Sequence, residues 1–212
     1  MRQLPWMVSC ALACSVAGAA GADVVGYWHC NGFDPAVSTV LTANVGSGVL
    51  DVTDFGTGAT AFGGTDVNAM AGVIAGDSVG LTGSSHNGAF AQINLSTAGW
   101  QDLSLSFAAR RSATGFANDT VQALIGGNWT NVATFTASST AWSLVTIDLS
   151  SFNALENGTA SLRLLLDGAT SGSGTIRFDN LTITGSTAVP APGAIALLGG
   201  AGLVGARGRR RR

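Results

Sequence analysis

Residues 102–107 read Asp-Leu-Ser-Leu-Ser-Phe, and this stretch decides the class of fold. Its apolar residues, Leu103, Leu105 and Phe107, share one parity, and the polar residues between them share the other. Successive side chains of a β-strand point to opposite faces, so the stretch predicts a strand with one buried face and one solvent-exposed face. Strands of this kind are typical of antiparallel sheets.

The central part of the chain repeats this pattern. Val145, Ile147 and Leu149 alternate with polar residues, helical periodicity is nearly absent, and small polar residues separate the apolar runs. About nine such runs predict an all-β fold, an antiparallel two-sheet β-sandwich of the jelly-roll type. The predicted strands are Val24–Cys30, Val49–Val52, Ala89–Leu95, Leu103–Ala109, Thr120–Ile125, Trp129–Phe135, Trp142–Leu149, Ser161–Leu166 and Thr175–Thr184.

The connections between these runs are rich in turn residues. Gly126-Gly127-Asn128 predicts a tight hairpin turn, because glycine adopts positive φ at little cost, and Asn157-Gly158 marks a second turn. Between Thr53 and Gly83 the chain is rich in Gly, Ala and Thr. There we expect a long loop or short edge strands.

The last predicted strand changes parity part-way along. Ile176 and Phe178 point one way, whereas Leu181 and Ile183 have the opposite parity. A β-bulge near Asp179-Asn180 would bring all four side chains to one face. The alternative is a strand that is covered on both faces.

Charge is distributed unevenly along the chain. All 10 basic residues are arginines, of which one lies near the N-terminus and five lie between Arg207 and Arg212. Residues 23–188 therefore hold 4 arginines against 12 acidic residues, a net charge of −8. A surface of this sign repels phosphate backbones, which argues against a nucleic-acid partner. It suits an extracellular, calcium-containing setting.

The first 22 residues have the layout of a secretory signal peptide. Arg2 precedes an apolar run from Leu4 to Ala20, and small residues lead to a cleavage site before Asp23. We expect an N-terminal signal helix that the secretion machinery recognises, with a lipoprotein signal as the lesser alternative. Cleavage would leave Cys30 without a partner for an intramolecular disulfide. We expect Cys30 to be a small buried hydrophobe, whereas an exposed Cys30 would link two chains.

The C-terminal end combines a proline motif, an apolar segment and an arginine cluster. A helix from Gly193 to Ala206 would span about 21 Å, against about 30 Å of membrane hydrocarbon. We therefore expect a short apolar helix that contacts the membrane transiently, with the arginines on the cytoplasmic side. The residues that carry this pattern are Val189, Pro190, Pro192, Arg207, Arg209, Arg210, Arg211 and Arg212.

This arrangement resembles the PEP-CTERM sorting signal of bacteria, with Ala191 where that family usually has Glu. The resemblance implies cleavage by an exosortase-type membrane enzyme and delivery to the cell surface, the outer membrane or the extracellular matrix. An ordinary tail anchor is the alternative. The chain then divides into a signal peptide (1–22), a β-sandwich domain (23–186) and a sorting tail (187–212).

The central part also resembles a family of secreted bacterial domains that PEP-CTERM proteins often carry. The resemblance covers about residues 28–185 and implies a jelly-roll sandwich similar to carbohydrate-binding modules. It rests on Leu95–Gly99, Leu103–Phe107, Arg111, Thr114–Phe116, Ile147–Ser150, Leu162–Gly168 and Arg177–Leu181.

The chain lacks the motifs of the common enzyme classes. It has no Gly-x-Ser-x-Gly, no His-Glu-x-x-His, no phosphate loop and no Cys-x-x-Cys. His29, His86 and the sole glutamate, Glu156, form no recognisable catalytic spacing. We therefore expect no catalysis and no required cofactor.

The acidic residues indicate one candidate metal site. Asp179 lies at the predicted bulge, and Ca²⁺ there would need further oxygens from residues such as Asp34, Asp23 or Asn180. The alternative is that the Asp179 carboxylate is hydrogen-bonded to a turn or paired with Arg177 or Arg163.

Three tryptophans are candidate sugar platforms, because aromatic rings stack on pyranose faces. Trp100, Trp129 and Trp142 lie beside predicted turns or at strand starts. Trp129 also shares its parity with Phe135, so the core is the alternative place for it. We expect a non-catalytic structural or adhesive domain of the cell surface or matrix. The second hypothesis is a carbohydrate-binding module for extracellular polysaccharide, and the third is an unrecognised hydrolase.

Overall fold

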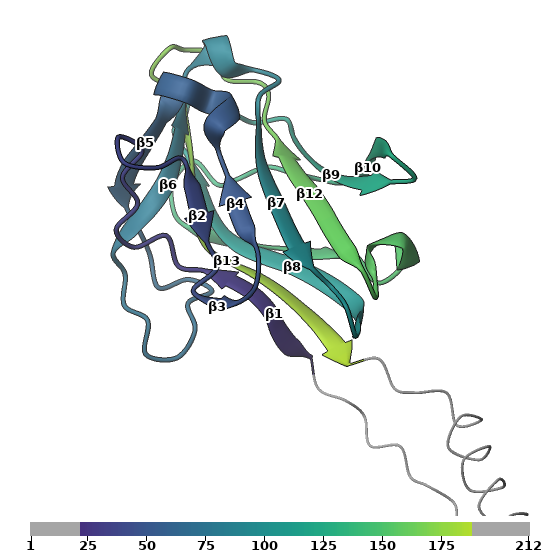
Figure 1. The fold of residues 1–212 in the computed structure, drawn as a ribbon. Coiled ribbons are helices and arrows are strands. Elements are labelled where there is room, and N and C mark those ends of the chain that lie inside the picture. Colours follow the sequence, from purple (N-terminus) through teal and green to yellow (C-terminus); the bar gives the residue numbers. More distant parts are fainter. Residues whose placement is uncertain (1–21, 188–212) are drawn as a thin grey trace, which may run out of the picture.

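Residues 22–187 of the computed structural model form two antiparallel sheets packed face to face (Figure 1). This is the predicted β-sandwich of the jelly-roll type. The signal segment, apart from Ala22, and the sorting motif with Pro190, Pro192 and the arginine cluster lie outside the described residues. In the part that the structure describes, no helix has the length and apolar character needed to span a bilayer.

The first sheet, called sheet A here, is built around β13, the C-terminal strand of the described chain. Its main path runs β11-β8-β13-β1-β3, and β6 also pairs with β13 and carries β5. The strands are β1 (Asp23–Trp28), β3 (Val45–Gly46), β5 (Ala59–Gly63), β6 (Asp77–Thr82), β8 (Trp100–Arg111), β11 (Ser143–Asp148) and β13 (Thr175–Thr187).

The second sheet, sheet B, has the order β10-β9-β12-β7-β4-β2. Three short 3₁₀ helices, Thr53–Gly58, Ser84–His86 and Asn153–Leu155, lie in the connections. The strands are β2 (Val40–Thr42), β4 (Val49–Asp51), β7 (Phe90–Ser96), β9 (Asp119–Ile125), β10 (Asn128–Phe135) and β12 (Thr159–Leu165).

The core lies between the two sheets and follows the predicted parity. Leu103, Leu105 and Phe107 are each at most 1% exposed. The Phe107 ring meets Phe135 of sheet B and Phe178 of sheet A edge-on, with centroids 5.2 and 5.5 Å apart. Edge-to-face contacts of this kind add to the burial of apolar area and join the two sheets.

The predicted bulge in β13 is confirmed. The register with β8 shifts between Asp179 and Thr182, and Asn180 has a φ of 50°. The shift turns both parities inward, because Ile176 and Phe178 before the bulge and Leu181 and Ile183 after it are all buried in the core.

The turn chemistry also agrees with the sequence. Gly126 and Gly127 have φ of 59° and 82° and form a two-residue hairpin between β9 and β10. In the Thr53–Gly83 region, β5 is a short edge strand, as expected there. The adjoining β6 is an inner strand that lies between β5 and β13. The short strands β2 and β3 were not predicted.

Candidate ligand-binding face

A row of polar side chains crosses the outer face of sheet B. Asp51 is the Cα partner of Gln92, which is also the partner of Arg163. Arg163 is in turn the partner of Gln122, and Gln122 is the partner of Asn131. Five neighbouring strands each contribute one polar side chain, and four strand spacings give the row a length of about 19 Å.

Two aromatic rings enclose the arginine at the middle of this row. The Arg163 guanidinium carbon lies 3.7 Å from the ring centroid of Phe90 and 3.8 Å from that of Trp129. Two rings this close to the same carbon cannot both stack on one face of the planar guanidinium group. The guanidinium of Arg163 therefore lies between the two rings. All three side chains are half-buried. Cation–π contacts of this kind hold the rings in place on the surface of the sheet.

The outward position of Trp129 results from a bulge in β10. The pairing of β10 with β9 shifts between Asn131 and Ala133. Trp129 and Asn131, before the shift, therefore lie on the outer face, whereas Phe135, after it, is 8% exposed and lies in the core. The sequence left open whether Trp129 points into the core or out to the surface, and the structure places it on the surface.

Hydrogen bonds order the polar row. Arg163 Nε donates to Gln92 Oε1 at 2.9 Å, and Gln92 Nε2 donates to Asn94 Oδ1 at 3.0 Å. Gln122 Nε2 donates to Asn131 Oδ1 at 2.9 Å. Each amide keeps further donor or acceptor capacity for a ligand. A hollow of about 430 Å³ beside Phe90 and Gln92 completes the face.

The sequence reasoning identified Trp129 but missed the other members of this face. The signal was present as a polar residue between two buried apolar residues on each central strand. Gln122 stands between Val121 and Ala123, and Arg163 stands between Leu162 and Leu164. A polar residue at the outward position of adjacent inner strands would have indicated the row.

The other two candidate tryptophans lie outside the strands of sheet B and do not join Trp129. Trp100 begins β8 and packs against the core. Trp142 directly precedes Ser143, which pairs with Ala109 near the opposite end of β8. The three predicted tryptophans therefore do not form one platform.

The two residues proposed to bind calcium, Asp179 and Asp34, differ in their burial. Asp179 is 1% exposed and accepts hydrogen bonds from the backbone N–H groups of Thr65 at 2.7 Å and Asn180 at 2.8 Å. Burial, with a smaller contribution from the charge of Asp77, raises its pKa to about 6. Asp34 is exposed and accepts the N–H of Ala36 in a turn. Within residues 22–187, no three His, Cys, Asp or Glu side chains gather as a metal site would require.

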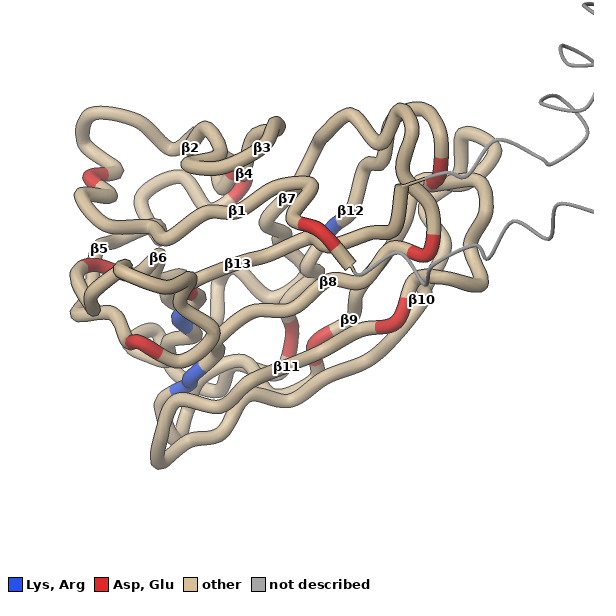
Figure 2. The backbone as a smooth tube through the Cα atoms, turned by 90° about the horizontal axis from the view of Figure 1, so that it is seen from below, with Lys and Arg blue, Asp and Glu red and all other residues tan. Residues whose placement is uncertain are grey.

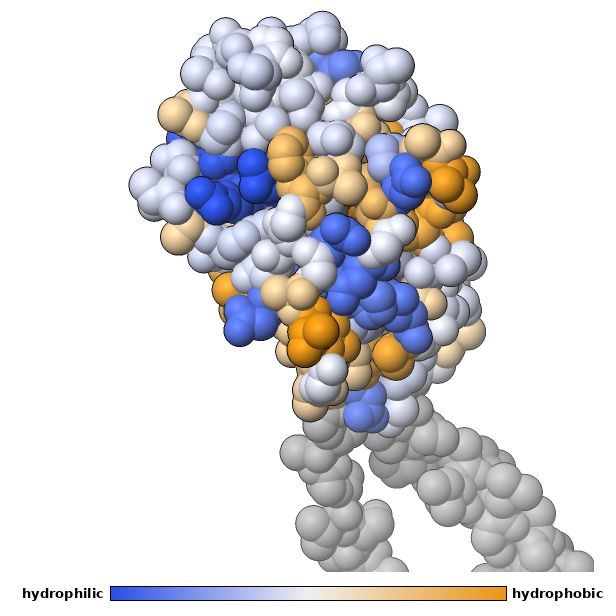
Figure 3. Space-filling view, turned by 90° about the vertical axis from the view of Figure 1, so that its left-hand side faces the viewer, coloured by the Kyte–Doolittle hydropathy of each residue, from blue (hydrophilic) through white to orange (hydrophobic). Residues whose placement is uncertain are grey.

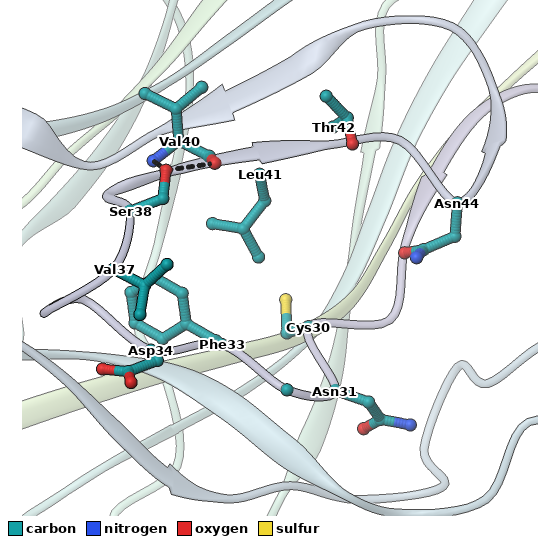
Figure 4. Close-up of a pocket in the computed structure, with 11 residues that line it drawn as sticks. Cys30, Asn31, Phe33, Asp34, Val37, Ser38, Val40, Leu41, Thr42 and Asn44 are labelled. Carbon is teal, nitrogen blue, oxygen red and sulfur yellow. Dashed lines mark hydrogen bonds between the residues drawn. The ribbon is translucent and has the colours of Figure 1, made fainter.

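A separate pocket of about 510 Å³ lies beside the loop that joins β1 to β2 (Figure 4). The Cys30 thiol and the Leu41 side chain point into it, and Val37 and Phe33 line one side. Cys30 is 2% exposed, and burial raises the pKa of its thiol well above the usual range. A thiol in this condition is not a nucleophile.

The residues considered for catalysis have structural contacts. His86 Nδ1 lies 2.7 Å from the carbonyl oxygen of Thr82, and His29 Nδ1 accepts the N–H of Asn31. Glu156 Oε1 accepts the N–H of Asp102. These contacts do not bring a nucleophile and a base together.

Apolar side chains on the surface are scattered. Figure 3 shows them as separate patches among hydrophilic residues on the face it presents. The most exposed large ones are Val37, at 83%, and Ile74, at 80%. Single exposed apolar residues are normal on protein surfaces and indicate no particular site.

Comparison with known proteins finds similar solved structures only. No protein-family model matches the chain, and no curated protein matches it. Among solved structures, the xylan-binding CBM22-1 domain of Xyn10C from Paenibacillus barcinonensis is similar at 14% identity and a TM-score of 0.47, over 81% of this chain and 100% of that one.

Two further similar structures have different functions in their names. A mutant of a family 29 carbohydrate-binding module is 11% identical with a TM-score of 0.43, over 78% of this chain and 92% of that one. The cleaved adhesin domain of Lys-gingipain is 13% identical with a TM-score of 0.39, over 63% of this chain and 86% of that one. At such values the ligands of those proteins say nothing about this chain.

Proposed function

We propose that the chain is a non-catalytic carbohydrate-binding domain and that the outer face of sheet B holds an extended neutral polysaccharide. The observation that carries the proposal is the Phe90–Arg163–Trp129 stack set into a row of amide and carboxylate side chains. Aromatic surface combined with a few placed polar groups is the chemistry that recognises sugar rings and their hydroxyls.

Each kind of side chain has a role in this proposal. The exposed parts of the Trp129 and Phe90 rings offer apolar surface to the C–H faces of sugars. Gln92, Gln122 and Asn131 offer amide donors and acceptors to hydroxyl groups on either side of that surface. Because the row crosses five strands, a linear chain of several sugar units fits it better than a single monosaccharide does.

Affinity electrophoresis of the full chain in gels that contain xylan, cellulose derivatives, glucomannan or galactan tests the proposal. We expect retardation by at least one of these polymers and its loss in Trp129→Ala. Trp142→Ala is the matched control, because it removes the same kind of side chain from the segment before β11, outside sheet B. Thermal unfolding checks that both variants fold. If no neutral polymer retards the wild type, the proposal is wrong and a purely structural or adhesive role remains.

We also propose that this domain acts outside the cell. The proposal is supported by the signal-like first 22 residues and by the proline motif, apolar segment and arginine cluster at the other end. An epitope placed after Gly208 provides the test. Loss of the tag from surface protein is expected for exosortase-type processing, and its retention there contradicts processing.

A further inference from the structure

A pair of arginines lies on the outer face of sheet A, away from the polar row. Arg110 of β8 and Arg177 of β13 are Cα partners. Their chain neighbours Ala109 and Ile176 are fully buried, so the arginines have the outward parity. Figure 2 shows the basic positions of β8 and β13 on one side of the molecule and that of β12 apart from them.

Neither of these guanidinium groups has an acceptor within residues 22–187. Arg111 and Arg163 donate to Ala137 and Gln92, whereas Arg110 and Arg177 make no such bond to the described chain. Like charges that face each other across a sheet repel. Burial lowers the pKa of Arg177, and the charge of Arg110 lowers it further.

An aromatic side chain packs against one member of the pair. The Arg177 guanidinium carbon lies 4.0 Å from the ring centroid of Phe62. That ring covers Gly80, where any side chain would collide with it.

The carboxylate of Asp179 does not neutralise the pair. Asp179 lies two residues after Arg177 on β13, but its oxygens accept N–H groups of Thr65 and Asn180. Its side chain is almost completely covered. The two arginines are therefore an uncompensated cationic site on a domain whose net charge is −8.

We propose that Arg110 and Arg177 bind the acidic group of a polysaccharide, a uronate carboxylate or a sulfate ester, at a site separate from the neutral-sugar face of sheet B. Two adjacent guanidinium groups match the paired oxygens of such groups. Phe62 offers ring surface to the sugar that carries the charge. The acidic remainder of the domain repels a polyanion elsewhere, so binding is local and weakens with salt.

The test is affinity electrophoresis of the full chain in gels that contain polygalacturonate, dextran sulfate or uncharged dextran, at low and high salt. We expect retardation by one or both charged polymers, no retardation by dextran, and weaker retardation at high salt. Retardation by polygalacturonate alone identifies a carboxylate as the bound group, and retardation by dextran sulfate alone identifies a sulfate ester. Retardation by neither charged polymer overturns the proposal.

Substitutions of Arg110 and Arg177 test whether the binding of charged polymers depends on these two side chains. Arg110→Gln and Arg177→Gln should each weaken binding at least about tenfold, the usual loss for a hydrogen bond to a charged group. Arg163→Gln, on sheet B, is the matched control and should leave this binding unchanged. If Arg177→Gln unfolds, Arg110→Gln decides alone. Equal binding by the wild type and a folded Arg110→Gln overturns the proposal, whatever the outcome with neutral polymers.

Discussion

Arg163 and Trp129 are in contact although β9 separates their strands. The guanidinium carbon of Arg163 on β12 lies 3.8 Å from the ring centroid of Trp129 on β10. The two side chains therefore meet over β9 on the outer face of sheet B. This contact, together with that of Phe90, joins side chains of three separate strands into one surface.

A double-mutant cycle should detect this contact as a coupling energy. Trp129→Leu and Arg163→Met are expected to couple by about 0.5–1 kcal/mol in the free energy of unfolding, as exposed cation–π pairs do. Urea unfolding of the wild type, both single variants and the double variant measures it. Trp129→Leu combined with Arg111→Met is the control and should give no coupling. Zero coupling for the first pair would show that the stack has no energetic role.

The bulge in β13 should depend on the side chain of Asn180 rather than on its backbone alone. Asn180 Oδ1 accepts the Tyr27 hydroxyl at 2.7 Å, and Nδ2 donates to the carbonyl oxygens of Thr65 and Val67. Asn180→Ala loses these buried bonds and should destabilise the fold by about 3 kcal/mol.

Asn180→Gly separates the two causes of that loss. Glycine accepts the φ of 50° without strain but restores none of the hydrogen bonds. We expect it to be nearly as unstable as the alanine variant in urea unfolding. A glycine variant as stable as the wild type would mean that backbone strain alone explains the loss.

Stability should fall as pH rises from about 4 to about 7. Asp119 and Asp179 are each 1% exposed, and burial raises their pKa to about 7 and about 6. In this window the folded chain binds more protons than the unfolded chain, so their stabilising contribution is complete below the unfolded pKa and is lost as pH rises through the folded values.

Asp119→Asn should flatten this dependence, because Asp119 Oδ2 has no hydrogen-bond partner in the described chain to compensate an ionised form. One pKa unit corresponds to about 1.4 kcal/mol, so the variant should be the more stable protein at pH 8 by a few kcal/mol and nearly equal to the wild type near pH 4. Urea unfolding across this range measures both slopes. Parallel curves for the two proteins would contradict the assignment to Asp119.

Cys30 should stay unreactive in the folded protein. Its thiol is 2% exposed with a raised pKa, so a thiol reagent needs local or global opening to reach it. We expect reaction with an aromatic disulfide reagent at pH 8 only after urea is added, and no covalent dimer on non-reducing electrophoresis. Fast reaction of the native chain would mean that the β1–β2 loop opens.

The sequence predicted the parts of the fold that depend on alternation along one strand. The buried face of Leu103, Leu105 and Phe107, the glycine hairpin and the β13 bulge all follow from local pattern and turn chemistry. The three-residue strand β2 and two-residue strand β3 are too short to show a period. Their pairing depends on neighbours distant in the sequence.

The residues of the candidate site were harder to predict from the sequence than the fold was. Alternation could not decide the direction of Trp129, because the register shift between Asn131 and Ala133 reverses the parity within one strand. The row from Asp51 to Asn131 exists only through the register of four strand pairs, which no single stretch of sequence specifies. Arg110 and Arg177, likewise, are 67 positions apart in the chain and are brought together by the pairing of β8 with β13.

The most direct measurement for the sheet B face is nuclear magnetic resonance mapping with oligosaccharides of the polymer that retards the chain. We expect the largest shifts at the side-chain amides of Gln92, Gln122 and Asn131 and at the indole N–H of Trp129. Shifts confined to the pocket between Cys30 and Asn44, or no shifts at saturating oligosaccharide, would contradict carbohydrate binding by this face.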